Sequence, residues 1–244
     1  MPTAINVYTP TLRSREQIAE GTMAFHITKP ADFQFRAGQS LDLTLIDPPE
    51  TDAEGNTRAF SLASAPFEDE LIIATRLRDT AFKRVLRSAP LDTSVKVEGP
   101  SGSFVLHRKA EKSAVFLAGG IGITPFLSII RQATHESAPH QLYLFYSNRR
   151  PEDSAFLDVL SQAATQNRQF RLIATMTEMA KSQREWHGET GFINKAMLTK
   201  YLPSLHGAIY YVAGPPAMVA AMRKMLTEAG VDEDDIRTEE FSGY

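Results

Sequence analysis

The sequence predicts two domains, an N-terminal antiparallel β-barrel followed by an α/β domain with a parallel sheet. Three observations carry this prediction. The chain has 244 residues, which is enough for two compact domains. Short strands broken by turns run up to about Leu106, and apolar strands that alternate with helices begin at Ser113. We therefore expect one domain over residues 1–109 and a second over residues 110–244, with the boundary near Arg108–Lys112.

The first half contains short strands, several with alternating apolar residues, as expected for a sheet with one buried face. The predicted strands are Met23–Ile27, Ser40–Ile46, Leu71–Arg76 and Ser94–Glu98. Turn-forming residues lie between them, at Ala37-Gly38, Asp47-Pro48-Pro49, Glu54-Gly55-Asn56 and Gly99-Pro100. This spacing is typical of a small antiparallel barrel. A helical turn is predicted over Thr80–Ser88, because Phe82, Val85 and Leu86 share one face.

The second half alternates buried strands with helices. The predicted strands are Ala114–Ala118, Gln141–Tyr146, Phe170–Met176 and Ile209–Ala213. The predicted helices are Pro125–Ala133, Ser154–Thr165 and Ala217–Glu228, the last ended by Gly230. Alternation of this kind predicts a parallel sheet covered by helices.

Composition excludes several classes of function. The net charge is -3, which gives no general attraction to nucleic acid or to anionic membranes. The chain has no cysteine, so it can form no disulfide, thiol nucleophile or cysteine-ligated iron–sulfur cluster. No segment has the apolar length that spans a bilayer, and residues 1–6 lack the layout of a secretory signal. We expect a cytoplasmic protein.

A glycine-rich turn follows the first predicted parallel strand and opens a helix, over Ala118–Pro125. Glycines let the backbone approach a phosphate, and the helix start presents N–H groups to an anion. The turn departs from the common dinucleotide fingerprint, since Pro125 takes the place of the third glycine and the segment Tyr146–Arg149 contains no carboxylate. The turn is predicted to bind phosphate, with a purely structural strand–helix turn as the alternative.

Three further motifs are ambiguous when each is taken alone. Ala213–Ala217 contains a Gly-Pro turn at a strand end, which is often only a turn. Arg58–Ser61 offers a cation, an aromatic ring and a hydroxyl, although a single arginine is often a solvated surface residue. Gly99–Phe104 could be a barrel corner.

Together and in this order, the four motifs resemble those of the ferredoxin–NADP reductase family of flavoproteins, over nearly the whole chain. The resemblance implies a flavin-binding barrel followed by a nicotinamide-binding α/β domain. It also implies that Arg58 pairs with a flavin phosphate, Phe60 packs against the flavin ring, and Ser61 lies near the reactive N5. Many relatives have Tyr in place of Phe60 and Cys in place of Ala213.

The resemblance supplies the remaining site residues. Segment Arg76–Lys83 falls where backbone amides of relatives lie along the flavin phosphates. Its arginines, Arg76 and Arg78, could alternatively be surface residues only. The residues expected to act in catalysis are Ser61, Thr124 and Phe241. The residues expected to bind cofactor are Arg58, Ala59, Phe60, Ser61, Thr75, Arg76, Thr80, Ala81, Phe82, Lys83, Gly119, Gly120, Gly122, Thr124, Asn148, Arg149, Gly214, Pro215 and Phe241. No metal site is expected.

The same motifs indicate which cofactors bind. FAD is favoured over FMN because the region after Leu77 could hold a pyrophosphate. NADH is favoured over NADPH because Thr177-Glu178 stands where NADP-selective relatives have Ser-Arg, while Arg149, Lys181 and Arg184 leave NADPH open. Phe241, rather than Tyr244, is expected to lie over the flavin, with a core-capping role as the alternative.

The implied function is a flavin-dependent NAD(P)H oxidoreductase. Hydride from the nicotinamide reaches the bound flavin, and the electrons pass to a separate acceptor: a ferredoxin, a flavodoxin, an oxygenase component or a small acceptor such as a quinone. The alternative is a non-catalytic flavin-binding electron-transfer subunit or redox sensor. A hydrolase is disfavoured, because the sequence has neither a Gly-x-Ser-x-Gly elbow nor a His-Glu-x-x-His pair.

Overall fold

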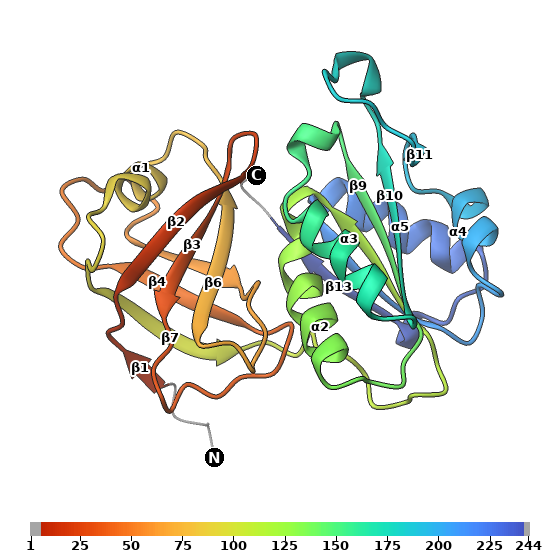
Figure 1. The fold of residues 1–244 in the computed structure, drawn as a ribbon, viewed down its shortest axis with the longest axis horizontal. Coiled ribbons are helices and arrows are strands. Elements are labelled where there is room, and N and C mark those ends of the chain that lie inside the picture. The colour runs from red at the N-terminus through yellow and green to blue at the C-terminus, as the bar shows by residue number, and fades with distance from the viewer. Residues whose placement is uncertain (1–5, 242–244) are drawn as a thin grey trace.

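The computed structural model describes residues 6–241, so the predicted alternative Tyr244 and the N-terminal segment 1–5 lie outside the described residues. Two bodies stand side by side, a β-rich one and an α/β one (Figure 1). The first contains β1 (Asn6–Tyr8), β2 (Leu12–Ala19), β3 (Thr22–Thr28), β4 (Ser40–Leu45), β5 (Thr57–Ser61), β6 (Glu70–Arg76), α1 (Ala81–Ser88) and β7 (Val95–Ser101).

These strands form two antiparallel sheets, with the orders β1-β7-β4-β5 and β2-β3-β6. Main-chain hydrogen bonds join the sheets at both sides, from Val95 N–H to the Pro10 carbonyl (2.9 Å) and from Ala63 N–H to the Ile72 carbonyl (2.8 Å). Alternate side chains such as Leu41 and Leu43 point inward and are fully buried, which is the pattern that predicted the barrel. The apolar face of α1 closes this core with Phe82, Val85 and Leu86.

The second body is built on a parallel sheet with the order β11-β10-β9-β8-β12-β13. Its elements are β8 (Ala114–Gly119), α2 (Thr124–His135), β9 (Leu142–Asn148), α3 (Leu157–Gln166), β10 (Phe170–Met176), β11 (Glu189–Thr190), α4 (Lys195–Tyr201), β12 (Ile209–Gly214), α5 (Pro216–Glu228) and β13 (Ile236–Glu240). Helices α2 and α3 cover one face and α4 and α5 the other (Figure 1). The predicted fold class is confirmed.

Two predicted details are wrong. Gly99-Pro100 is not a turn, because Gly99 lies inside β7 and pairs with Asn6 of β1. Helix α3 begins at Leu157 rather than at Ser154, because Phe156 adopts a left-handed conformation with φ of 60° that a helix cannot include.

The two bodies contact each other through polar and aromatic pairs. Ser128 of α2 donates a hydrogen bond to the Ser64 carbonyl at 2.6 Å, and Arg131 pairs with Glu68 at 2.9 Å. The ring of Phe67 stacks on His135 at 4.0 Å. The predicted boundary at residues 109–110 lies in the connection between β7 and β8 and stays a prediction.

Within residues 6–241, no helix combines the length and the apolar character needed to cross a lipid bilayer.

Candidate functional site

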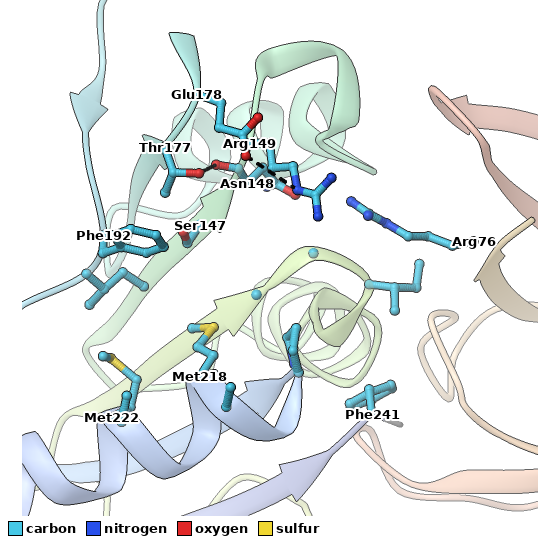
Figure 2. Close-up of a pocket in the computed structure, with 17 residues that line it drawn as sticks. Arg76, Ser147, Asn148, Arg149, Thr177, Glu178, Phe192, Met218, Met222 and Phe241 are labelled. Carbon is cyan, nitrogen blue, oxygen red and sulfur yellow. Dashed lines mark hydrogen bonds and ion pairs between the residues drawn. The ribbon is translucent and has the colours of Figure 1, made fainter. Parts of the chain in front are cut away.

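A cavity of about 720 Å³ opens at the carboxyl ends of the parallel strands (Figure 2). This is the edge at which open α/β sheets place their ligands. One wall of the cavity comes from the barrel, through Arg76 at the end of β6. The predicted cofactor residues that line it are Arg76, Gly119, Gly120, Asn148, Arg149, Pro215 and Phe241.

The glycine turn forms the floor of this cavity. Gly120 has a φ of 54°, a left-handed conformation that favours glycine, and it starts the short 3₁₀ turn that precedes α2. Gly122 faces away from the cavity lining, and a Cβ on it would come within 2.4 Å of the Ala213 carbonyl oxygen. Gly120 therefore serves the cavity, while Gly122 lets the turn pack against β12.

Two guanidinium groups converge at the mouth of the cavity. Arg149 extends from the end of β9 and Arg76 from the barrel, and Figure 2 shows their side chains pointing toward each other. Arg76 also overhangs the glycine turn, since a Cβ on Gly120 would lie 3.8 Å from Arg76 Nη2. Like charges in such an arrangement repel, so an anion placed between them would be stabilised by both.

The opposite end of the cavity is apolar. Met218 and Met222 project from α5, and Phe192 stands over the same end with 77% of its surface exposed (Figure 2). A large aromatic ring left exposed beside methionine side chains is suited to a flat apolar ligand group. None of these three residues was among the predicted ones.

A polar edge lies between the cation pair and the apolar end. Asn148 is only 5% exposed, and neither its Oδ1 nor its Nδ2 has a hydrogen-bond partner in the part of the chain that the structure describes. Buried amides are normally paired, so this side chain is available to a ligand. The neighbouring Glu178 accepts a hydrogen bond from Lys181 at 2.7 Å and lies 3.9 Å from Arg149. The Lys181 hydrogen bond lowers the pKa of Glu178.

Some predicted nicotinamide-side residues lie beside the cavity rather than in it. Thr124 is 1% exposed, and its hydroxyl donates to the Ile121 carbonyl at 3.2 Å. Gly214 passes close to Gly119, so that a Cβ on Gly214 would lie 3.2 Å from the Gly119 backbone.

Phe241, in contrast, lines the cavity at its barrel end, and its N–H donates to the Gly214 carbonyl at 3.0 Å.

The barrel carries a second group of predicted residues around the start of α1. The N–H of Ala81 donates to Asp52 Oδ2 at 2.9 Å, and Arg58 Nη2 lies 3.5 Å from Asp52 Oδ1. The Ala81 hydrogen bond is the largest influence that lowers the pKa of Asp52. A helix start and a guanidinium thus converge on one carboxylate, and both are groups that also bind phosphates in proteins. These residues fit a flavin phosphate.

Aromatic packing positions Arg58. Its guanidinium lies 5.1 Å from the centre of the Phe82 ring, and Phe82 lies 6.0 Å from Phe60. Both phenylalanines are almost fully buried in the barrel core. Phe60 therefore packs near the ring that the Arg58 guanidinium lies over, in addition to the flavin contact that the resemblance implies.

The other predicted barrel residues differ in how far their side chains are exposed to solvent. Thr75 is fully buried and donates to the Arg76 carbonyl at 3.2 Å, and Ala59 is exposed on β5. Thr80 caps α1 by accepting from Lys83 N–H at 3.4 Å. Burial lowers the pKa of the Lys83 ammonium, with Arg78 and Arg58 acting in the same direction.

A contact between the two bodies involves a residue that the sequence did not single out. Ser61 Oγ donates to Glu239 Oε2 at 3.4 Å, from β5 to β13. Burial raises the pKa of Glu239, while the Ser61 hydrogen bond acts against this rise. A hydroxyl and a carboxyl group from different domains thus meet at the domain junction.

Comparison with known proteins agrees with this architecture. Residues 116–224 match the family described as the oxidoreductase NAD-binding domain. Phenol hydroxylase P5 protein from Acinetobacter pittii is 28% identical over 218 residues, which cover 88% of this chain and 59% of that protein. One component of the Na(+)-translocating NADH-quinone reductase of Yersinia enterocolitica is 28% identical over 206 residues, covering 78% of this chain and 50% of that component. The chain thus spans between half and three fifths of the length of these two relatives.

Solved structures establish the fold. The cytochrome P450 reductase of Amycolatopsis superposes with a TM-score of 0.82 at 24% identity, covering 97% of this chain and 70% of that one. A ferredoxin NADP+ reductase from Neisseria gonorrhoeae, with bound FAD and NADP, gives a TM-score of 0.77 at 21% identity, covering 96% of this chain and 98% of that one.

The fold is that of a two-domain protein, and most of its second half matches the oxidoreductase NAD-binding domain. The chain shares its fold with solved reductases of the ferredoxin–NADP reductase type, which agrees with the resemblance carried by its four motifs.

Proposed function

We propose that this chain is a flavin-dependent NAD(P)H oxidoreductase that passes electrons to an acceptor outside these residues. The observation that carries the proposal is the cavity wall shared by the two bodies, in which Arg76 of the barrel faces the glycine turn and Arg149. A dinucleotide lying along the cavity would have its pyrophosphate between the guanidinium groups. Its two ends would then lie at Phe192 and at Phe241.

The polarity of the cavity supports this orientation. The adenine would occupy the apolar end beside Phe192, Met218 and Met222, where these side chains would cover its flat ring. The nicotinamide would lie toward Phe241 and Pro215, next to the barrel. The buried amide of Asn148, without a partner among the described residues, would hydrogen-bond the ligand between these ends.

The flavin would lie on the barrel side of the same junction. Arg58 and the N–H of Ala81 would hold its phosphate, as their shared contact with Asp52 suggests. When bound, the flavin would supply the hydride-accepting and electron-releasing chemistry. The chain's own part is to hold both ligands in line at the junction and to exclude water from it.

Ser61 and Glu239 support a proton-handling role at this junction. Their side chains come from different domains and meet at 3.4 Å. Burial raises the pKa of Glu239 above its ordinary value and so favours the neutral form of this carboxyl. It would accept or return the proton that accompanies electron release to a one-electron acceptor.

We further propose NADH as the preferred donor and FAD as the flavin. Ionised Glu178 stands at the end of β10, where it would accept hydrogen bonds from a ribose and repel an added phosphate. Lys181 pairs with Glu178 at 2.7 Å, so this cation is already engaged by the carboxylate rather than available to an added phosphate. The names of the relatives suggest what kind of acceptor receives the electrons, since one is a phenol hydroxylase protein and another belongs to a quinone reductase. The electron acceptor would then be an oxygenase component, a ferredoxin, a flavodoxin or a quinone.

The flavin assignment is tested by denaturing the purified protein and recording the absorbance spectrum and mass of the released cofactor. A flavin spectrum with the mass of FAD is expected. Release of FMN would overturn the choice of FAD but not the reductase. A protein that carries no flavin and gains none when FAD is added would contradict the proposed function.

A further inference from the structure

Three carboxylates of the loop over residues 46–56, between β4 and β5, contact α1 or the arginine of β5 beside it. Glu50 receives two hydrogen bonds from Arg84, at 2.9 and 2.8 Å, and Glu54 pairs with Arg58 at 2.8 Å. Asp52 lies between them and binds the Ala81 N–H. We call this segment the acidic loop.

We infer that the acidic loop is an internal competitor for the flavin phosphate, with Asp52 occupying the phosphate position and leaving it when flavin binds. This inference rests on the proposed function and adds a regulatory device to the same site. Its physical basis is that a carboxylate and a phosphate seek the same donors, namely a helix N-terminal N–H and a guanidinium. Two anions cannot share that position without strong repulsion.

The contacts of Arg58 show how fully the acidic loop occupies the proposed phosphate site. Its Nη1 donates to the carbonyls of Glu54, Gly55 and Thr57 at 2.9, 3.0 and 2.8 Å. Its Nη2 binds the carboxylate of Glu54 at 2.8 Å and lies 3.5 Å from that of Asp52. A phosphate that takes this arginine must therefore replace contacts that the acidic loop now makes.

The loop is also built as a discrete unit. Asp52 Oδ1 accepts from the Glu54 N–H at 3.0 Å and the Asp52 carbonyl accepts from Gly55 N–H at 2.9 Å, so the tip is a self-contained turn. Asn56 fixes its far end by donating to the Leu45 carbonyl at 2.8 Å. Such a turn can swing away from α1 while keeping its own hydrogen bonds.

The test compares flavin affinities of flavin-free wild type, Asp52→Asn and Asp47→Asn, measured by fluorescence titration. Asp52→Asn keeps the shape and the turn but removes the competing charge. Asp47→Asn removes the same charge from an exposed position of the same loop that makes no ion pair with any described residue. Each protein is titrated with FAD, FMN and riboflavin, because riboflavin has no phosphate.

We expect Asp52→Asn to bind FAD and FMN about tenfold more tightly than wild type, the effect of one charge-assisted contact. Riboflavin affinity is expected to stay unchanged in all three proteins, and Asp47→Asn to match wild type. Unchanged or weaker FAD binding by Asp52→Asn, or an equal gain with riboflavin, would overturn the inference while leaving the reductase proposal intact. A wild type that binds none of the three flavins would overturn the proposed function itself.

The riboflavin titration also reports folding, because a misfolded variant would lose riboflavin as well. If Asp52→Asn fails in this way, Glu54→Gln takes its place, since it releases Arg58 without touching α1. The same gain for FAD and FMN alone is expected, and its absence would overturn the inference.

Discussion

Ser61 and Glu239 meet across the domain junction, with Ser61 Oγ donating to Glu239 Oε2 at 3.4 Å. The pair joins the strand that carries the Arg-x-Phe-Ser motif to the last strand of the parallel sheet. It places a carboxyl group between the two proposed cofactor sites. The first prediction follows from the charge of this carboxyl.

Glu239 is expected to make stability depend on pH. Burial raises its pKa in the folded protein above the ordinary value of 4.5, so the folded state favours the protonated form. The stabilising contribution is therefore complete below pH 4.5 and is lost as pH rises through the raised folded-state pKa. Glu239→Gln cannot ionise at this position and should not lose stability in this way. The free energy of unfolding of Glu239→Gln should therefore rise relative to that of wild type as the pH increases from 4.5 through the raised pKa.

Urea unfolding at a series of pH values measures the effect. Glu240→Gln is the matched control, because Glu240 is exposed on the same strand and should follow wild type. A constant difference between Glu239→Gln and wild type at every pH would contradict the assignment of a raised pKa.

Arg76 and Arg149 are expected to bind the dinucleotide through its pyrophosphate. Replacing either with Ala should raise KM for NADH about tenfold, because each removes one charge-assisted contact that is equally strong in the ground and transition states. The value of kcat should stay within about twofold for the same reason. Steady-state rates with a fixed artificial acceptor give both constants.

Arg171→Ala serves as the control, since Arg171 is exposed at the opposite end of β10 from the cavity and lies outside its lining. An unchanged KM in both Arg76→Ala and Arg149→Ala would rule out the proposed position of the pyrophosphate.

Glu178 is expected to select NADH over NADPH. Its hydrogen bond with Lys181 keeps the carboxylate ionised at neutral pH, and an added phosphate on the ribose would be repelled. The double variant Thr177→Ser with Glu178→Arg should shift the ratio of kcat/KM for NADPH to that for NADH upward by at least about tenfold.

Glu185→Arg makes the same charge change on the same connection with a side chain that is 94% exposed. It should leave the ratio where wild type has it. Equal shifts in the two variants would mean that general surface charge, and not Glu178, sets the preference.

The sequence predicted most of the fold, because the elements that make it have strong local patterns. Ala114–Ala118 is a continuous apolar run, as a strand buried on both faces requires, and it lies in β8. Strand β2 was missed because its exposed side chains, such as Arg13 and Glu16, give it no apolar alternation. Helix α4 was missed because it has only 7 residues, too few to show a helical period.

The site was predicted in part, for similar physical reasons. A glycine turn has a local signature, and the predicted residues Gly120 and Arg149 do line the cavity. Met218 and Met222 have helical spacing, which on sequence alone looks like core packing. Glu239 lies in the run Thr238-Glu239-Glu240, which resembles an exposed strand, and only the contact between domains buries it.

The central claim is that a dinucleotide in the cavity delivers hydride to a flavin on the barrel. Mixing the flavin-loaded protein with NADH in the absence of oxygen, in a stopped-flow spectrometer, tests it most directly. We predict that the flavin absorbance bleaches and that Arg149→Ala requires about tenfold more NADH for the same rate. A flavin that stays oxidised in the presence of excess NADH and NADPH would contradict this claim and favour a non-catalytic electron-transfer subunit.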